Sequence, residues 1–435
     1  MRRSPKNLQI TCNHAGLTHF GGVCFFQEFL KVLQLRHLLT RHLDYPRHRN
    51  HYSMPQMILA LIYPIVLGHD RIEAASFLRS NGVFQYLTGL PGYPDPQTSR
   101  RFLRQAPLTF RQQLHRLNDR LLQKFTHVPK QRSRLIFDLD STVVTVFGQQ
   151  EGAAVGYNPR YKGKRSYDPL LCFEVNSSYL WGTQLRPGNA GPWQGTEKLL
   201  SSLYENLPPE IREIRVRADS GFGFDPVLRL LEEFRTEYVV AARMTAPIKR
   251  LLPGLSWREA PSGWELAETM YRARGWPEAR RIVAARCETE QGMDETTLFV
   301  HRNYRYRAWV TNLSLSPGGI WRFYDGRAEI EPRIRELREE YALRNIPTGL
   351  FAANDLYLEI IRLAYNLVTY FQVTCLPEDW QQYTLEKLRT KLFLTPAELV
   401  RPHNRPTLRL SKELGIDDLA DGILAKIAEI DPLDL

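Results

Sequence analysis

The sequence predicts an α/β protein with a mixed sheet flanked by helices, preceded by an all-α segment and interrupted by a β-rich insertion. Residues 20–125 place apolar side chains at helical spacing. From residue 134 onward, strand-like and helix-like segments alternate, which is the order of elements in an α/β sheet. Residues 246–306 contain short β-like pieces and predict the insertion. The 435 residues are enough for two or three domains with a substantial core.

Positive charge is concentrated at the beginning of the chain. The formal net charge is +11, but residues 1–134 alone hold 20 Lys and Arg residues against 6 Asp and Glu residues. The remaining residues hold 38 Lys and Arg against 41 Asp and Glu, so all of the excess positive charge lies in the first third of the chain. A basic segment joined to a mildly acidic body indicates a module that binds a polyanion, or alternatively a solubilising basic face.

The basic segment is predicted to be helical throughout. Its longer helices are expected over residues 25–43, 71–90 and 110–125. Between the last two, Asp95-Pro96 is typical of a helix start, where the Asp side chain caps free N–H groups. The short helix that begins there carries Arg100, Arg101 and Arg104. A helix-turn-helix presents its recognition helix in this way, so we expect these arginines to contact DNA; a solvated basic helix is the alternative.

Membrane and secretory classes are not indicated. No apolar run approaches the roughly 20 residues that a membrane span needs, and residues 57–68 are interrupted by Pro64. The first residues are basic but lack the apolar stretch of a signal peptide. The five cysteines are scattered without a CxxC pair, which argues against a disulfide framework and a zinc knuckle. We therefore expect a protein of the reducing cytoplasm.

The core begins with a strand that carries two acids. In the stretch RLIFDLDST, residues 134–142, apolar residues surround Asp138 and Asp140. Because strand side chains alternate between faces, the two carboxylates point the same way. Burying them is costly unless a cation compensates their charge. That cation is either a bound metal ion or an arginine, with Arg165 or Arg217 as the partner.

Two further acids are predicted to lie close to Asp140. Asp219 ends a later strand, so both acids follow strand C-termini, where open α/β sheets place their sites. A third carboxylate follows the predicted strand over residues 306–314, at Glu329 or Glu331. Three converging carboxylates suit one or two Mg²⁺ or Mn²⁺ ions, and a metal pair activates a water or a 3′-hydroxyl for phosphoryl transfer.

The loop over residues 148–169 interleaves basic and aromatic side chains. Its candidate DNA-binding residues are Lys162, Lys164 and Arg165. Its tyrosines are Tyr157, Tyr161 and Tyr167. This mixture beside a metal site suits contacts with DNA phosphates and stacking on bases, while a flexible solvated loop is the alternative.

The remaining elements continue the α/β order. Further strands are expected over residues 170–175, 237–243 and 306–314. Further helices are expected over residues 196–207, 225–234, 327–344 and 356–376. The last of these is apolar nearly all round and is therefore expected to be buried. Four domains or parts are predicted. Residues 1–130 form a helical basic domain, and residues 131–245 form the first part of the core. Residues 246–306 form the insertion, and residues 307–435 form the second part of the core with C-terminal helices.

Four sequence blocks occur in the order in which a known family has them. They are DLDST, QQEGAAVGYNPRYKGKRSYDPL, RADSGF and YDGRAEIEPRIRELR. These blocks resemble the DDE transposases of bacterial insertion sequences, in the IS four-like superfamily and closest to the IS thirteen-eighty family. The resemblance extends from about residue 21 to about residue 411. It implies an RNase H-like core with a β-rich insertion, whose three catalytic and metal-binding acids match Asp140, Asp219 and Glu331.

The last block resembles the family's motif of Tyr, Arg, Glu and Lys. Tyr324, Arg327 and Glu331 fit its spacing, and Arg338 stands where the family has lysine. Arginine keeps the charge but changes the geometry of phosphate binding. The resemblance implies that Tyr324, Arg327 and Arg338 hold the phosphate of a DNA end near the metals. Pro332 fits only a first helical turn, so we expect the helix to start close to Glu331.

The resemblance also implies a function. The chain is expected to bind the terminal inverted repeats of a transposon, cleave the ends and join them to target DNA, with two Mg²⁺ or Mn²⁺ ions per active site. Its implied partners are double-stranded DNA and a second copy of the chain, because two ends must be cleaved. The alternatives are a domesticated or inactive DNA-binding protein and a stand-alone RNase H-like nuclease. A glycosidase also needs paired carboxylates, but the concentrated positive charge has no role there.

Overall fold

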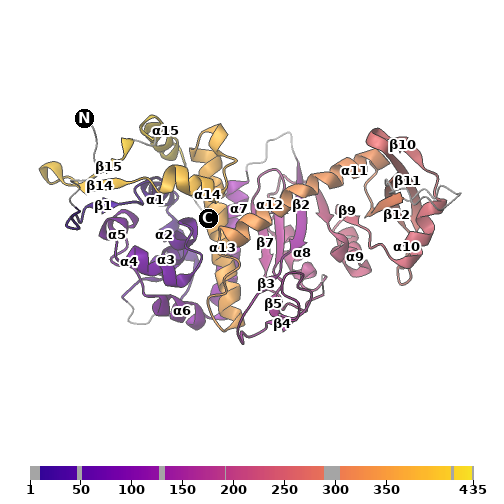
Figure 1. Ribbon diagram of the computed structural model, residues 1–435, viewed down its shortest axis with the longest axis horizontal. Coiled ribbons are helices and arrows are strands. Elements are labelled where there is room, and N and C mark those ends of the chain that lie inside the picture. Colours follow the sequence, from indigo (N-terminus) through magenta and orange to yellow (C-terminus); the bar gives the residue numbers. More distant parts are fainter. Residues whose placement is uncertain are drawn as a thin grey trace. The chain divides into compact units, whose positions relative to one another are not determined.

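The computed structural model divides into two compact units, and most of their helices and strands are labelled in Figure 1. The helical unit comprises residues 1–110, 340–342 and 367–435. The sheet unit comprises residues 111–339 and 343–366. The residues whose structure is described are 10–46, 51–126, 133–191, 193–288, 304–412 and 416–433.

Helices dominate the N-terminal part of the helical unit. They are α1 (Val23–Val32), α2 (Leu35–His42), α3 (Met54–Val66), η2 (Ile72–Ala74), α4 (Ala75–Arg79), α5 (Gly82–Thr88) and α6 (Pro96–Gln105). The helix predicted over residues 25–43 is divided into α1 and α2, because Gln34 between them has a left-handed conformation with φ 54°. The helix start at Asp95-Pro96 is confirmed, since the Asp95 carboxylate accepts a hydrogen bond from the N–H of Gln97 at 2.8 Å.

The C-terminal segment completes the helical unit. Residues 367–435 belong to this unit, although the sequence pattern assigns them to the second part of the core. Their elements are η7 (Glu378–Trp380), α14 (Leu385–Leu388), η8 (Arg389–Phe393), β14 (Ala397–Val400), η9 (Pro402–Asn404), β15 (Thr407–Leu410) and α15 (Asp417–Ala428). β14 pairs with β15 and with β1 (Leu17–Thr18), so the N-terminal segment is not purely helical. Phe371 and Phe393 pack against Phe26 in an aromatic core.

Within the described part of the chain, a nine-stranded mixed sheet forms the centre of the sheet unit. Its strands are β2 (Arg134–Ser141), β6 (Leu170–Glu174), β7 (Leu180–Gln184), β8 (Glu213–Ala218), β9 (Glu237–Ala241), β10 (Arg258–Ala260), β11 (Trp264–Tyr271), β12 (Arg280–Glu288) and β13 (Tyr304–Thr311). Their spatial order is β10-β11-β12-β13-β9-β8-β2-β6-β7. β2 is parallel to β8 and β8 to β9, whereas the other pairs are antiparallel. The carboxyl ends of β2 and β8 therefore reach the same edge of the sheet.

The strands of the predicted insertion extend the main sheet instead of forming a separate body. β12 pairs along its length with β11 on one side and with β13 on the other. β13 then joins the core through Trp309, Val310 and Thr311, which pair with β9. This pairing satisfies backbone groups that would otherwise be free along β9. Residues 289–303 of the predicted insertion lie outside the described residues.

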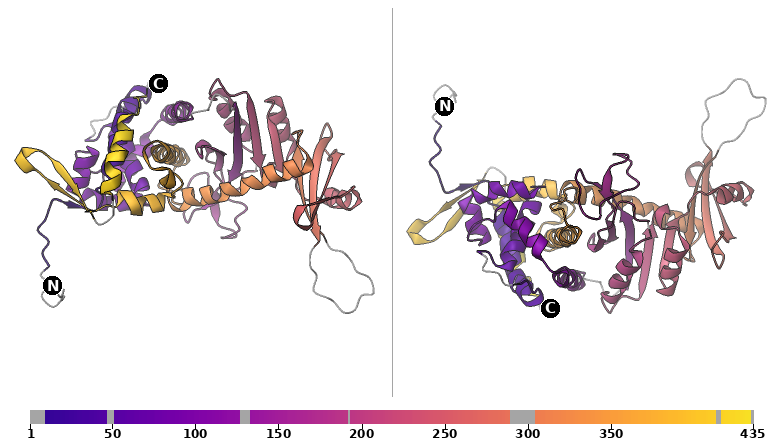
Figure 2. Two further views of the ribbon diagram at one scale, coloured as in Figure 1. Left: turned by 90° about the horizontal axis from the view of Figure 1, so that it is seen from above. Right: turned by 90° about the horizontal axis from the view of Figure 1, so that it is seen from below.

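The helices of the sheet unit lie on the faces and at one edge of the sheet. The shorter ones are α8 (Thr196–Glu205), η3 (Ser220–Phe222), α9 (Asp225–Glu233), α10 (Ala246–Leu251), η4 (Leu252–Gly254), η5 (Pro261–Gly263), α11 (Pro317–Asp325), η6 (Gly326–Glu329) and α12 (Ile330–Glu339). α11, η6 and α12 form one helical run along a face of the sheet (Figures 1 and 2). The two long helices α7 (Leu108–Phe125) and α13 (Phe351–Cys375) contribute residues to both units. None of the described helices is long and apolar enough to cross a membrane.

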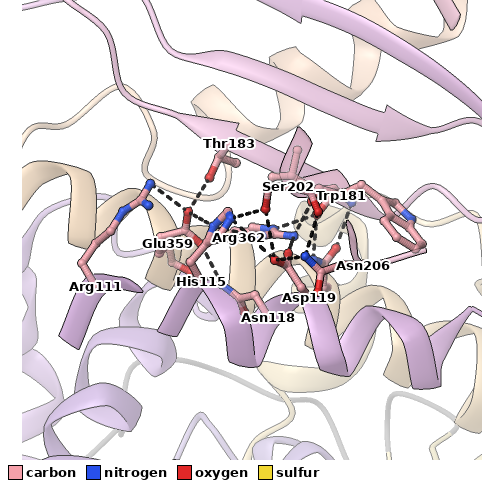
Figure 3. Close-up of polar contacts among 12 residues, drawn as sticks. Arg111, His115, Asn118, Asp119, Trp181, Thr183, Ser202, Asn206, Glu359 and Arg362 are labelled. Atoms are coloured by element: carbon pink, nitrogen blue, oxygen red, sulfur yellow. Dashed lines mark hydrogen bonds and ion pairs between the residues drawn. The ribbon is translucent and has the colours of Figure 1, made fainter. Parts of the chain in front are cut away.

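A buried charged network joins α7, α13 and β7 inside the sheet unit (Figure 3). Glu359 and Arg362 of α13 are fully buried. Arg362 pairs with Asp119 of α7 at 2.5 Å and donates a hydrogen bond to the Leu180 carbonyl of β7 at 3.2 Å. Glu359 lies 2.9 Å from Nδ1 of His115. Burial raises the pKa of Glu359, but His115 and the nearby arginines outweigh burial and hold this pKa well below its usual value.

Removing one charge from this network is expected to destabilise the protein strongly. Arg362→Met is expected to lower the free energy of unfolding by about 3–5 kcal/mol, because Asp119 and Glu359 stay buried with one cation fewer. Chemical denaturation of the full chain measures this change. Lys198→Met, at an exposed position of the same unit, is the control and is expected to change the free energy by less than about 0.5 kcal/mol. Equal effects of the two substitutions would contradict a structural role for the network.

Candidate active site

Asp138 on β2 is the partner of a buried arginine. It is 2% exposed, and its Oδ1 and Oδ2 accept hydrogen bonds from Nε and Nη2 of Arg217 at 2.6 and 2.8 Å. Parallel pairing of β2 with β8 places the two residues opposite each other, so the partner is Arg217 and not Arg165. Nη1 of Arg217 also donates to the Phe323 carbonyl at 2.9 Å, which fixes the end of α11. This approach needs Gly326, where a Cβ atom would lie 2.5 Å from Nη1.

Asp140 lies two residues further along β2, where the strand ends. Its Oδ2 is 2.8 Å from Nη2 of Arg327, and its Oδ1 accepts a hydrogen bond from the Ser141 N–H at 2.8 Å. Burial raises the pKa of Asp140 to about 6; Arg327 opposes this shift and the charge of Asp219 adds to it. The ionised form of such a carboxylate is stabilised by any further cation placed beside it.

Asp219 directly follows β8 and is fixed by the turn that it begins. Its Oδ1 accepts a hydrogen bond from the Gly221 N–H at 2.9 Å. Leu139 of β2 is opposite Ala218 of β8, so Asp140 and Asp219 directly follow two paired residues of neighbouring parallel strands. The structure therefore brings Asp140 and Asp219 together at the edge where β2 and β8 end.

Tyr324 and Arg327 approach the same two acids from α11 and η6. Besides its pair with Asp140, Nη2 of Arg327 donates to the Leu139 carbonyl at 3.2 Å. Burial raises the pKa of Tyr324, Arg327 lowers it, and the charges of Asp219 and Asp140 raise it further. Tyr324 and Arg327, the first two residues of the predicted motif, are thus near the two aspartates. Arg327 is the cation beside Asp140 in this structure.

Neither candidate for the third acid contacts the two aspartates. Glu329 is exposed, and its Oε2 lies 4.0 Å from Nη2 of Arg333. Glu331 is also exposed, but it lies four residues after Arg327 and hence on the same side of the helical run. Glu329 lies two residues after Arg327 in η6, a 3₁₀ helix with three residues per turn, or about 240° around the helix. Among the described residues, no group of three or more His, Cys, Asp or Glu side chains is arranged to hold a metal ion.

Arg338 lies seven residues after Glu331, about two turns along α12. It is half-buried, and within the described ranges it forms no ion pair with Asp140 or Asp219. Its Nε is buried and has no hydrogen-bond partner among the described residues.

The basic loop contains a small sheet in the order β3-β5-β4. Its strands are β3 (Val144–Thr145), β4 (Ala154–Val155) and β5 (Arg165–Tyr167). The three basic residues expected to contact DNA are exposed: Lys162, Lys164 and Arg165. Tyr157 and Tyr161 are 81% and 43% exposed, so both are available for stacking. Tyr167 is not available, because it is buried and its hydroxyl donates to the Glu151 carbonyl.

The predicted recognition helix α6 exposes only some of its arginines. Arg100 is largely buried and forms an ion pair with Glu73 of η2, so its charge is compensated inside the helical unit. Arg101 and Arg104 are exposed. Of the three arginines expected to contact DNA, Arg101 and Arg104 are therefore the ones available to a partner.

The sequence pattern gives no role to Asp168, yet this acid lies near the site. Burial raises the pKa of Asp168, Arg186 and a hydrogen bond with Ser141 oppose the shift, and the charge of Asp219 adds to it. Leu170, two residues after Asp168, is opposite Ser141 of β2, so Asp168 lies at the edge of the sheet where β2 ends. The signal in the sequence is an acid two residues before the apolar strand β6, which is the neighbour of β2.

Comparisons with known proteins identify a family. The sequence model described as "Transposase DDE domain group 1" matches residues 3–432. No curated protein matches the chain. Among solved structures, the chain is similar to a piggyBac transposase synaptic complex with hairpin DNA, with 12% identity, a TM-score of 0.43, and coverage of 96% of this chain and 86% of that chain. It is also similar to a Drosophila P element transposase strand transfer complex, with 11% identity and a TM-score of 0.23. The match covers 47% of this chain and 42% of that chain.

Proposed function

The chain belongs to the DDE transposase family, and we propose that it binds transposon terminal inverted repeats, cleaves the ends and joins them to target DNA by two-metal phosphoryl transfer. The observation that carries this proposal is the pair Asp140 and Asp219 at the ends of two parallel strands, with Arg327 beside them. The four sequence blocks support an RNase H-like core for the mixed sheet. They also support a place in the IS four-like superfamily, closest to the IS thirteen-eighty family.

The residues of the site fit divalent cations. Asp140 and Asp219 supply carboxylate oxygens, which Mg²⁺ and Mn²⁺ prefer as ligands. Asp140 is half-buried and burial raises its pKa, so a cation beside it favours its ionised form. Glu331 is the proposed third ligand because it follows Arg327 by one helical turn. When bound, two such ions supply activation of the attacking oxygen and stabilisation of the leaving oxygen.

The other residues of the site hold the DNA and the protein framework. Tyr324 and Arg327 are proposed to bind the phosphate of a DNA end next to the acids, and the planar guanidinium of Arg327 suits two parallel hydrogen bonds to phosphate. Arg338 is proposed to contribute a further phosphate contact from α12. Asp138 has no part in the reaction; through Arg217 it fixes β8 and the end of α11 in position.

DNA contacts are proposed for the basic N-terminal segment and for the basic loop of the sheet unit. The residues proposed to make them are Arg101, Arg104, Lys162, Lys164 and Arg165, all of which are exposed. Cleavage at both transposon ends requires two active sites, so we propose a homodimer on DNA. The reaction would take place on DNA in a bacterial cytoplasm.

Incubation of the purified full chain with labelled terminal-repeat duplexes tests the proposed function. Nicks at the repeat ends and joined products with target DNA are expected in Mg²⁺, and chelation is expected to remove both while binding is retained. Cutting without preference for the ends would favour a stand-alone nuclease. End binding without cleavage in either Mg²⁺ or Mn²⁺ would favour an inactive DNA-binding protein.

Replacing Arg101 and Arg104 together with alanine is expected to weaken end binding by about tenfold or more, because each lost contact contributes about 1–3 kcal/mol. The salt dependence of binding is also expected to become less steep. Fluorescence anisotropy with the full chain between roughly 50 and 200 mM salt measures both effects. The double replacement of Lys198 and Arg229 removes the same charge from the sheet unit and is the control. If it weakens binding equally, α6 is not the recognition helix.

A further inference from the structure

A short β-hairpin in the C-terminal segment carries a concentration of positive charge. It consists of β14, η9 and β15, and it extends beyond the helices of the helical unit (Figures 1 and 2). Residues 367–435 hold 8 Lys and Arg against 11 Asp and Glu, yet residues 400–412 hold four Lys and Arg and no acid. The four are Arg401, Arg405, Arg409 and Lys412. Basic side chains are therefore gathered on one projecting element of an otherwise acidic segment.

The base of the hairpin is fixed to the helical unit. β14 pairs with β1 on one side and with β15 on the other. Beside these pairs, the Leu399 N–H donates to the Gly16 carbonyl at 2.8 Å. The Ser411 N–H donates to the Pro396 carbonyl at 2.8 Å and closes the hairpin at its foot. Because the base is held in this way, the tip loses little conformational freedom when a partner binds.

The tip of the hairpin is a preformed and exposed turn. Its sequence is RPHNRP, residues 401–406, and its two prolines have a fixed φ. His403 and Asn404 between the prolines have left-handed φ values of 51° and 61°. The Arg405 N–H donates to the Pro402 carbonyl at 3.0 Å. Every residue from 401 to 407 is exposed, so packing inside the chain does not account for the residue types of the turn.

Two arginines of the hairpin are not compensated by acids. Glu398 is opposite Arg409 in the register of β14 and β15, but its Oε1 lies 3.1 Å from Nε2 of His14. Within the part of the chain that the structure describes, the guanidinium groups of Arg405 and Arg409 form neither an ion pair nor a hydrogen bond. Uncompensated cations on one short element repel each other, so their placement points to a polyanion outside the chain.

We propose that the hairpin of β14 and β15 is a DNA-binding arm whose tip enters the minor groove of the duplex. This inference rests on the proposed function, to which it adds a contact surface besides α6 and the basic loop. Two-stranded ribbons bind DNA in its grooves. Arginine and asparagine bind in the minor groove, whose negative potential also attracts histidine. His403, Asn404 and Arg405 supply these groups at the tip, and Arg409 of β15 is assigned to a phosphate.

Fluorescence anisotropy of the full chain with a labelled terminal-repeat duplex tests this arm. Replacing Arg405 and Arg409 together with alanine is expected to weaken binding about tenfold or more, and to lower the slope of log affinity against log salt by about 1 to 2. Replacing Lys387 and Lys391 is the matched control, since both are exposed in the same segment but lie outside the hairpin. The control is expected to retain most of the affinity, and equal losses in the two variants would overturn the proposal.

Methylation of the bound duplex by dimethyl sulfate locates the tip. The reagent modifies adenine N3, which lies in the minor groove, and guanine N7, which lies in the major groove. At saturating protein, the unsubstituted chain is expected to protect adenine N3 at positions that stay reactive with the Arg405 and Arg409 variant. Protection of guanine N7 is expected to be equal for both proteins. A loss of guanine N7 protection alone would overturn the minor-groove assignment.

Failure of this inference is distinguishable from failure of the proposed function. If the unsubstituted chain does not bind the terminal-repeat duplex, the proposed function itself fails. If it binds, and the Arg405 and Arg409 variant binds equally well with the same salt dependence, only the assignment of the hairpin fails. Both side chains are exposed and unbonded within the described residues, so the variant is expected to keep the melting temperature of the unsubstituted chain.

Discussion

Asp140→Asn is expected to reduce metal-dependent strand cleavage by on the order of 10³-fold or more, while binding of transposon ends is retained. The substitution keeps the size of the side chain but removes one ligand charge. Stabilisation of transition-state charge by metal ions contributes several kcal/mol, and each 1.4 kcal/mol corresponds to about tenfold in rate. Cleavage of pre-bound end DNA in Mg²⁺, together with a binding titration, measures both parts of the expectation.

Asp138→Asn is the matched control, because it changes the same chemical group on the same face of β2. Asp138 is engaged by Arg217 through two hydrogen bonds of 2.6 and 2.8 Å, so its loss is expected to lower the melting temperature. Cleavage is expected to persist at a temperature at which this variant is folded. An active Asp140→Asn beside an inactive, folded Asp138→Asn would show that the two roles are reversed.

The local pattern of residues 134–142 is enough to predict β2 and the shared face of its two acids. This is because side chains alternate between the two faces of any strand, whatever its neighbours are. The cation beside each acid does not follow from that pattern. Arg217 comes from β8 and Arg327 from η6, and only the register between β2 and β8 places Arg217 opposite Asp138. A sequence reading therefore leaves Arg165 open as a partner, although the structure does not use it.

Long-range pairing accounts for the differences between the predicted and the observed organisation. The start of α6 is predictable, since capping by Asp95 involves only neighbouring residues. The pairing of β1 with β14 joins opposite ends of the sequence, and no local signal indicates which segment covers an exposed strand. Arg100 and Arg101 are likewise equivalent in the sequence, but the packing of α6 brings only Arg100 to Glu73.

Glu331→Gln is expected to eliminate Mg²⁺-dependent cleavage, whereas Glu329→Gln is expected to retain most of it. Arg327 sets the orientation of the helical run, because its guanidinium is held at Asp140 at 2.8 Å. Glu331 lies about one turn beyond Arg327 on the same side, while Glu329 is about 240° away in the 3₁₀ helix η6. Oε2 of Glu329 lies 4.0 Å from Nη2 of Arg333, so its nearest charged partner is that arginine.

The structure of α12 also favours Glu331 over Glu329 as the third ligand. Ile330, Ile334 and Leu337 are the buried residues of α12, so the side of the helix that packs is fixed. Pro332 has no N–H to donate to the carbonyl four residues earlier, which explains why the run is a 3₁₀ helix over η6 and becomes an α-helix only at α12. Glu331 consequently lies in the first turn of α12.

Cleavage of pre-bound end DNA in Mg²⁺ by the two purified variants decides between the two acids, with circular dichroism to establish that both are folded. Glutamine keeps the volume of glutamate and removes only the charge, so a loss confined to Glu331→Gln is a loss of a ligand and not of packing. An active Glu331→Gln beside an inactive Glu329→Gln would move the third ligand by two residues. Tyr324 and Arg327 would then no longer share a helical side with it, and their assignment as phosphate-binding residues would have to be abandoned too.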